Sequence, residues 1–179
     1  MYEPRTFTSK VHPVKLVAKE MDEPNPGRMI WRYEFWVNGK IVQDKSIDYR
    51  WSGLFPNLDN VQFESEDSRY YFIPAEGVVL YDWEQKSFYK TPASREFKNN
   101  AFVGNAFTED YLVMVMQRSF LVLHVDRKKS VEVIFPFGEL QIKSFHMRGS
   151  LLTLQYKDLS DFATKEKAYD IGKTFSSWE

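Results

Sequence analysis

The stretch that decides the fold is RYYFIPAEGVVLYDWEQKSF, residues 69–88. Its first six residues are rich in aromatic and β-branched side chains, Ala75-Glu76-Gly77 can reverse the chain, and the VVLY that follows is apolar. A polar break, DWEQ, then separates this hairpin from a further extended run that begins with KSF. The stretch therefore predicts a strand, a tight turn, a second strand, a second turn and a third strand.

Weaker copies of this pattern occur at residues 29–47, 110–135 and 150–175, and the first copy contains the hairpin signal Asn38-Gly39. The first paired strands would begin 41, 41 and 40 residues apart, at Met29, Tyr70, Tyr111 and Leu151. The later turns lie 41, 43 and 44 residues apart, at Lys45-Ser46, Lys86-Ser87, Lys129-Ser130 and Lys173-Thr174. A period of about 40 to 45 residues with four strands per unit is typical of propeller blades.

The chain resembles the β-propeller superfamily in a recurring order of an apolar strand, Asp, a short polar turn, Lys and Ser or Thr. This order runs from Tyr81-Asp82 to Ser87, from Val125-Asp126 to Ser130 and from Tyr169-Asp170 to Thr174. The resemblance implies an all-β fold of four antiparallel units, a small four-bladed propeller-like domain; an irregular β-sandwich is the alternative. We expect one domain over residues 1–179, with repeat units at 13–52, 60–92, 101–136 and 139–178.

Other segments fit this scheme. Residues 13–19 alternate apolar and polar side chains, as a strand with one buried face would, whereas residues 1–12 are expected to be partly ordered at best. Gly104 interrupts a predicted strand and indicates a bulge or a close backbone approach. Residues 159–167 are the best helical candidate, and they are short.

Composition limits the classes of function. The chain has 179 residues, 43% hydrophobic and 17% aromatic, which is enough for a substantial core. The net charge is −1 and charges of both signs are interspersed, so nothing favours nucleic-acid binding. We find no membrane-length apolar run, no signal-peptide core and no Cys, and we expect a soluble, cytoplasmic protein.

Signals for chemistry are weak. None of the three His residues has metal-ligand spacing, and no phosphate loop, nucleophile elbow or dinucleotide fingerprint occurs. We therefore predict no catalytic residue, no metal and no cofactor, and enzymatic activity is without support.

The predicted binding surface consists of the connectors on one face of the repeat. Among them, residues 48–60 carry several aromatic side chains, which either pack under the loop or serve as binding anchors. We nominate Tyr49, Arg50, Trp51 and Phe55 as anchors, and as charged partners Arg95, Glu96, Arg118, Asp158 and Asp161.

The main hypothesis is a non-enzymatic module that binds a protein partner, such as an immunity or inhibitor protein. The alternative is a small-molecule or carbohydrate-binding protein, or a hydrolase, that uses the same face with Asp158 or Asp161 as the polar group. A homo-oligomer would follow if the sheets do not close within one chain.

Overall fold

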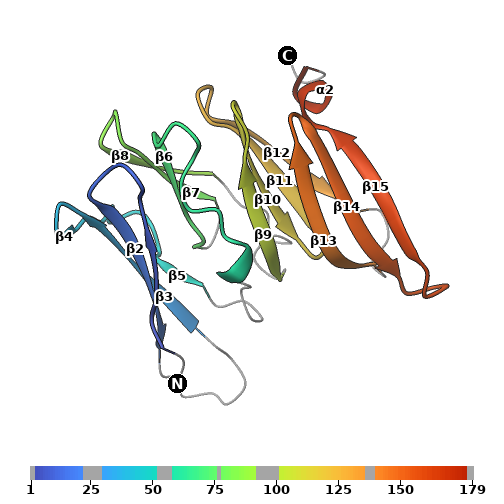
Figure 1. Ribbon diagram of the computed structural model, residues 1–179, viewed down its shortest axis with the longest axis horizontal. Coiled ribbons are helices and arrows are strands. Elements are labelled where there is room, and N and C mark those ends of the chain that lie inside the picture. The colour runs from blue at the N-terminus through green and yellow to red at the C-terminus, as the bar shows by residue number, and fades with distance from the viewer. Residues whose placement is uncertain are drawn as a thin grey trace. The chain divides into compact units, whose positions relative to one another are not determined.

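The computed structural model describes residues 3–21, 30–51, 58–75, 78–91, 101–135 and 140–176, and the regular secondary structure of these residues is almost entirely antiparallel strand (Figure 1). The chain divides into two compact units. Unit 1 comprises Met1–Pro56 and Gln62–Asn99, and unit 2 comprises Asn57–Val61 and Asn100–Glu179. Within the described part of the chain, no helix has the length and apolarity needed to cross a membrane. The division into one domain stays a prediction.

Unit 1 contains two sheets. In the first, the strand order is β1-β2-β3-β4, and β5 also pairs with β3; the strands are β1 (Arg5–Thr8), β2 (Val14–Met21), β3 (Ile30–Val37), β4 (Lys40–Ile41) and β5 (Arg50–Trp51). The second is a meander of β6 (Tyr70–Ile73), β7 (Val79–Asp82) and β8 (Ser87–Lys90). Glu64 adds a single bridge to Tyr71 at the edge of this meander.

Unit 2 also contains two sheets, both simple meanders (Figure 1). The first consists of β9 (Phe102–Phe107), β10 (Tyr111–Met116), β11 (Ser119–His124) and β12 (Lys129–Ile134). The second consists of β13 (Leu140–Arg148), β14 (Leu151–Asp158) and β15 (Thr164–Asp170). Two short helices complete the unit, the 3-10 turn η1 (Leu58–Asn60) and α2 (Ile171–Ser176).

The prediction of an all-β fold with four antiparallel units is confirmed, because the four sheets are separate and each is an open antiparallel array. The predicted starts of the first paired strands agree with the structure wherever it describes them. Tyr70, Tyr111 and Leu151 are each the first residue of a strand, while Met29 lies outside the described residues. The hairpin and the third strand predicted for residues 69–88 are present as β6, β7 and β8.

The turn predicted at Lys173-Thr174, in the fourth copy of the repeat, is wrong. Lys86 lies in the turn just before β8 and Lys129 is the first residue of β12, but Lys173 lies in α2. The reason is local: the Asp170 carboxylate accepts a hydrogen bond from the Lys173 amide at 3.2 Å, three residues ahead. An aspartate in that position caps the N-terminus of a helix, so the same Asp that would open a turn starts a helix instead.

Two expectations about the ends of the chain also change. Residues 5–8, expected to be partly ordered at best, form β1, which pairs with β2 along its whole length. Residues 159–167, the best helical candidate, hold a turn followed by the start of β15. In both places pairing with a neighbouring strand outweighs the weak local signal. The alternation predicted for residues 13–19 is confirmed, since Val14, Leu16 and Ala18 are buried.

The core of unit 1 is aromatic. The Phe35 side chain on β3 is fully buried, and its ring centroid lies 4.8 Å from that of Tyr81 and 5.5 Å from that of Phe88. The rings of Phe63 and Tyr71 lie further out, 6.4 and 6.3 Å from Phe35. Tilted and edge-on rings at these separations pack favourably, so the aromatic excess of the sequence serves to join the two sheets of unit 1.

Tyr33 is a polar exception in this core. Its side chain is fully buried, and its hydroxyl has no hydrogen-bond partner among the described residues. Burial raises the pKa of the phenol well above its usual range. We expect Tyr33→Phe to raise the free energy of unfolding by about 1 kcal/mol, because it removes a buried hydroxyl that gains no hydrogen bond. Urea denaturation of both proteins measures this.

The control is Tyr71→Phe, since the Tyr71 hydroxyl lies 2.9 Å from the Ser9 hydroxyl and should be stabilising. That change should lower stability by about 1 kcal/mol. Equal losses in the two variants would show that Tyr33 has a hydrogen-bond partner in solution.

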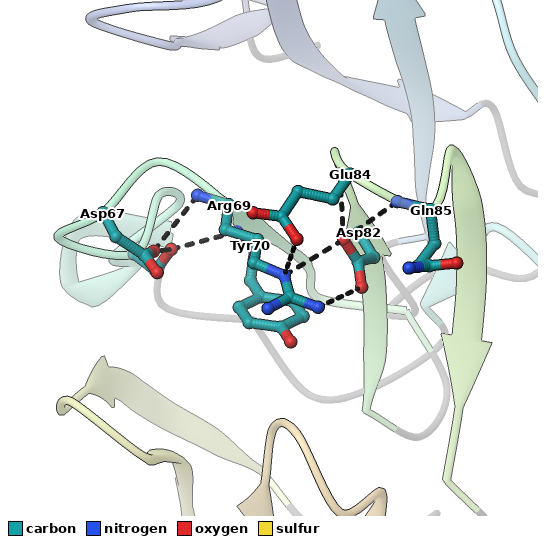
Figure 2. Close-up of polar contacts among 7 residues, drawn as sticks. Asp67, Arg69, Tyr70, Asp82, Glu84 and Gln85 are labelled. Atoms are coloured by element: carbon teal, nitrogen blue, oxygen red, sulfur yellow. Dashed lines mark hydrogen bonds and ion pairs between the residues drawn. The ribbon is translucent and has the colours of Figure 1, made fainter.

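A charge cluster fixes the end of the second sheet of unit 1 (Figure 2). The Arg69 guanidinium lies 3.3 Å from Asp82 and 3.3 Å from Glu84, and the Asp82 carboxylate also accepts the backbone amides of Glu84 and Gln85. Asp82 therefore closes the β7–β8 turn and also pairs with Arg69, the residue that precedes β6. Because every group of this cluster has a partner, we assign it a structural role.

Candidate functional site

The tip of the β14–β15 hairpin combines exposed apolar side chains with a fixed backbone. β14 and β15 pair from Leu151 with Asp170 to Lys157 with Thr164, and the Asp158 amide then donates to the Ala163 carbonyl at 2.9 Å. Both strands extend into the polar segment 157–166, so the loop between them is short. Only five residues, 159–163, form the loop.

Aspartates stabilise this loop from inside. Asp158 accepts hydrogen bonds from the Ser160 amide at 2.9 Å and the Ser160 hydroxyl at 2.6 Å, and Asp161 accepts the Ala163 amide at 2.9 Å. Aspartate side chains that bond the backbone two residues ahead form stable turns. The loop conformation is therefore determined by its own side chains.

A lysine links the two aspartates. The Lys165 ammonium lies 2.7 Å from Asp158 and 2.8 Å from Asp161. The hydrogen bond from Lys165, with those from Ser160, lowers the pKa of Asp158 to about 2, and Lys165 likewise lowers the pKa of Asp161. Both carboxylates are therefore ionised and already paired at neutral pH, so neither is available as a general acid.

The apolar side chains of the same loop point to a different use. Phe162 is 69% exposed and Leu159 is 42% exposed. Phe162 also has a positive φ of 57°, a conformation that costs a bulky residue energy, and the Lys157 ammonium lies 5.2 Å from its ring centroid. A strained backbone that presents a large apolar ring to solvent is a feature found at recognition sites.

The nominated residues divide between the units. Tyr49 is buried in unit 1, where its hydroxyl accepts the Asp44 amide at 2.8 Å and its ring packs on Phe88. Arg50 is exposed on β5 and binds Asp48 through two hydrogen bonds of 2.9 Å. Trp51 belongs to β5, but its side chain, like Phe55, Arg95 and Glu96, lies outside the described residues.

In unit 2, Arg118 is exposed in the turn between β10 and β11, while Asp158 and Asp161 meet in the loop described above. Sequence reasoning missed Phe162, Leu159 and Lys165. The sequence did contain a signal for Phe162. It is a single aromatic residue next to the turn-forming Asp161, in a polar segment that is not expected to be buried.

Metal binding has no support in the described residues, which contain no cluster of three or more His, Asp or Glu side chains suited to hold an ion. Of the histidines, His12 stacks on Trp83 at 4.2 Å, and His124 accepts the Arg127 amide at its Nδ1. Both contacts are of the kind that structural histidines make.

Comparisons with known proteins add little. The chain matches no protein-family model and no curated protein. Two solved structures show a weak likeness, both extracellular domains from B. thetaiotaomicron, one described as part of a one-component system and one as part of a hybrid two-component system. Their TM-scores are 0.42, with 11% and 9% identity over 81% of this chain. The chain spans only 23% and 22% of their lengths, and a likeness this weak carries no functional argument.

Proposed function

We propose that this protein is a propeller-like, non-enzymatic module that binds a protein partner, and that the tip of the β14–β15 hairpin is its main anchor. The observation that carries the proposal is the exposed, strained Phe162 beside exposed Leu159 on a loop that its own side chains hold in place. A rigid aromatic anchor loses little conformational entropy on binding, which is why such residues dominate interface hot spots.

The chemistry of the tip defines the partner. Lys157 and Lys165 balance Asp158 and Asp161, and Lys165 pairs with both aspartates, so the loop carries no net charge. A partner with an apolar depression large enough for one aromatic ring fits this surface, and it needs no excess charge of its own. Binding should therefore depend weakly on salt.

The experiment compares the wild type with Phe162→Gly. Glycine removes the ring and relieves the positive φ, so the variant should lose the partner while its free energy of unfolding stays equal or rises by up to about 1 kcal/mol. Tagged proteins are exposed to native cell extract at about 0.1 M and about 1 M NaCl, and bound proteins are identified by mass spectrometry.

The matched control is Val11→Gly, which removes another exposed apolar side chain, 68% exposed, from unit 1. A stoichiometric protein that both the wild type and Val11→Gly retain, and Phe162→Gly loses, supports the proposal. Retention by all three, or a clear fall in the stability of Phe162→Gly, would show that Phe162 has a structural role.

A further inference from the structure

Beneath the hairpin tip, one face of the β13–β15 sheet borders a pocket of about 250 Å³. Its lining comes entirely from unit 2: Phe135, Leu140, Ile142, Leu154, Tyr156, Asp158, Lys165, Lys167 and Tyr169. The strand alternation explains this set, because Leu154, Tyr156 and Asp158 are alternate residues of β14, and Lys165, Lys167 and Tyr169 are alternate residues of β15. The pairings of Leu154 with Lys167 and of Tyr156 with Lys165 place these two rows side by side.

The floor of the pocket is apolar. Ile142 and Leu154 are buried members of the unit 2 core, and Phe135 belongs to the same cluster. Tyr169, whose ring lies edge-on to Phe120 at 4.8 Å, forms a wall that packing holds in position. These side chains are fixed from behind, so the pocket does not depend on a ligand to form it.

The two lysines at the rim differ in what they contact. Lys165 is neutralised by Asp158 and Asp161. The Lys167 ammonium lies 5.0 Å from the Tyr169 ring centroid, and no carboxylate of the described residues pairs with it. Lys167 is exposed at the mouth of the pocket and has ammonium donors to offer an incoming acceptor.

We infer that this pocket binds a small organic monocarboxylate with a flat apolar body, whose carboxylate pairs with Lys167. Lys165 is offset by Asp158 and Asp161, so Lys167 is the described lining residue whose single positive charge can pair with a monoanion. A doubly charged phosphate fits less well because the Asp158 carboxylate lies in the same lining. The sequence-based alternative gave the polar role to Asp158 or Asp161, and both already pair with Lys165; the available group is Lys167.

The volume limits the ligand. At about 30 Å³ per water molecule, the pocket displaces about eight waters, and a ligand of about ten non-hydrogen atoms fits it. Phenylacetate has this size and shape, and with so few atoms a Kd on the order of 1 mM is expected.

The test titrates phenylacetate, its isosteric amide phenylacetamide and the cationic phenethylamine, which is of similar size, into the full chain and follows the methyl NMR signals of Ile142 and Leu154. Phenylacetate should shift these signals and bind about tenfold or more tightly than the amide, because only the carboxylate forms a charge-assisted bond with Lys167. The amine should bind most weakly.

Lys167→Met keeps an unbranched side chain one atom shorter than lysine but removes the charge, and it should reduce phenylacetate binding to the level of the amide. Lys143→Met is the matched control, since Lys143 lies on β13 outside the lining and should bind phenylacetate like the wild type. Equal affinity for the three probes, equal losses in both variants, or no shift of the two methyl signals at the highest soluble concentration would overturn the assignment.

Discussion

Gly104→Ala is expected to lower the free energy of unfolding by about 3 kcal/mol, because no space exists for a Cβ atom at this position of β9. Such an atom would lie 2.7 Å from the Asn60 Cβ, 2.7 Å from the Phe145 ring and 2.9 Å from the Asn60 backbone oxygen. A backbone oxygen cannot move away without shifting η1, and the Asn60 side chain also bonds the Val103 carbonyl at 3.2 Å. The close approach predicted at Gly104 is confirmed.

Thermal and urea unfolding measure this loss, which should lower Tm by about 6 to 12 °C for a chain of this size. Gly172→Ala serves as the control, since its new Cβ would meet nothing nearer than 3.4 Å and alanine favours the helix α2. A loss of less than about 1 kcal/mol in Gly104→Ala would mean that β9 and η1 do not approach in this way in solution.

Asp82→Ala is expected to cost about 3 kcal/mol, the second large effect. The side chain of Asp82 is only 5% exposed, and its removal leaves the Glu84 and Gln85 amides and the Arg69 guanidinium without their main acceptor. Asp82→Asn keeps an oxygen for the turn and should cost less. Glu84→Gln, at the exposed side of Arg69, should change stability by no more than about 0.5 kcal/mol.

The ion pair between Arg69 and Asp82 also makes the free energy of unfolding depend on pH. Burial alone would raise the pKa of Asp82, but the hydrogen bond from Arg69 and those from the turn amides outweigh it and lower the pKa below its ordinary 3.8. A carboxyl whose pKa falls on folding stabilises the native state above its unfolded pKa, and it loses that contribution as the pH falls through the folded pKa.

The stability difference between wild type and Asp82→Asn should therefore be constant above about pH 5 and shrink below about pH 4. Urea midpoints measured at intervals from neutral to acid pH check this, with Glu84→Gln as the reference. A difference that stays the same down to about pH 2 would contradict an ionised Asp82 in the native state.

Turn chemistry and strand alternation were readable from the sequence because both depend on neighbouring residues. Asn38-Gly39 adopts φ values of 50° and 75°, as the hairpin signal predicts, and Lys86 takes a positive φ in the turn between β7 and β8. The alternation of β2 marked its buried face for the same reason. These local rules were enough to predict four antiparallel sheets.

The candidate site was less predictable. Asp158 and Asp161 were nominated as interaction residues, and the structure shows that they stabilise their own loop and pair with Lys165. Tyr49 was nominated as an anchor, and it packs in the core of unit 1. In each case the sequence showed a polar or aromatic residue in a connector, but it did not show which residue that side chain would contact.

The sequence by itself determined the all-β class and the four antiparallel groups of strands, since these follow from side-chain periodicity and backbone preferences over a few residues. Only the tertiary structure decided that Lys165 is neutralised while Lys167 lies over Tyr169 with no carboxylate partner among the described residues, and that Phe162 is exposed whereas Tyr49 is buried. The physical reason is that burial and ion pairing depend on which strands lie side by side, and residues with the same local pattern can meet different neighbours.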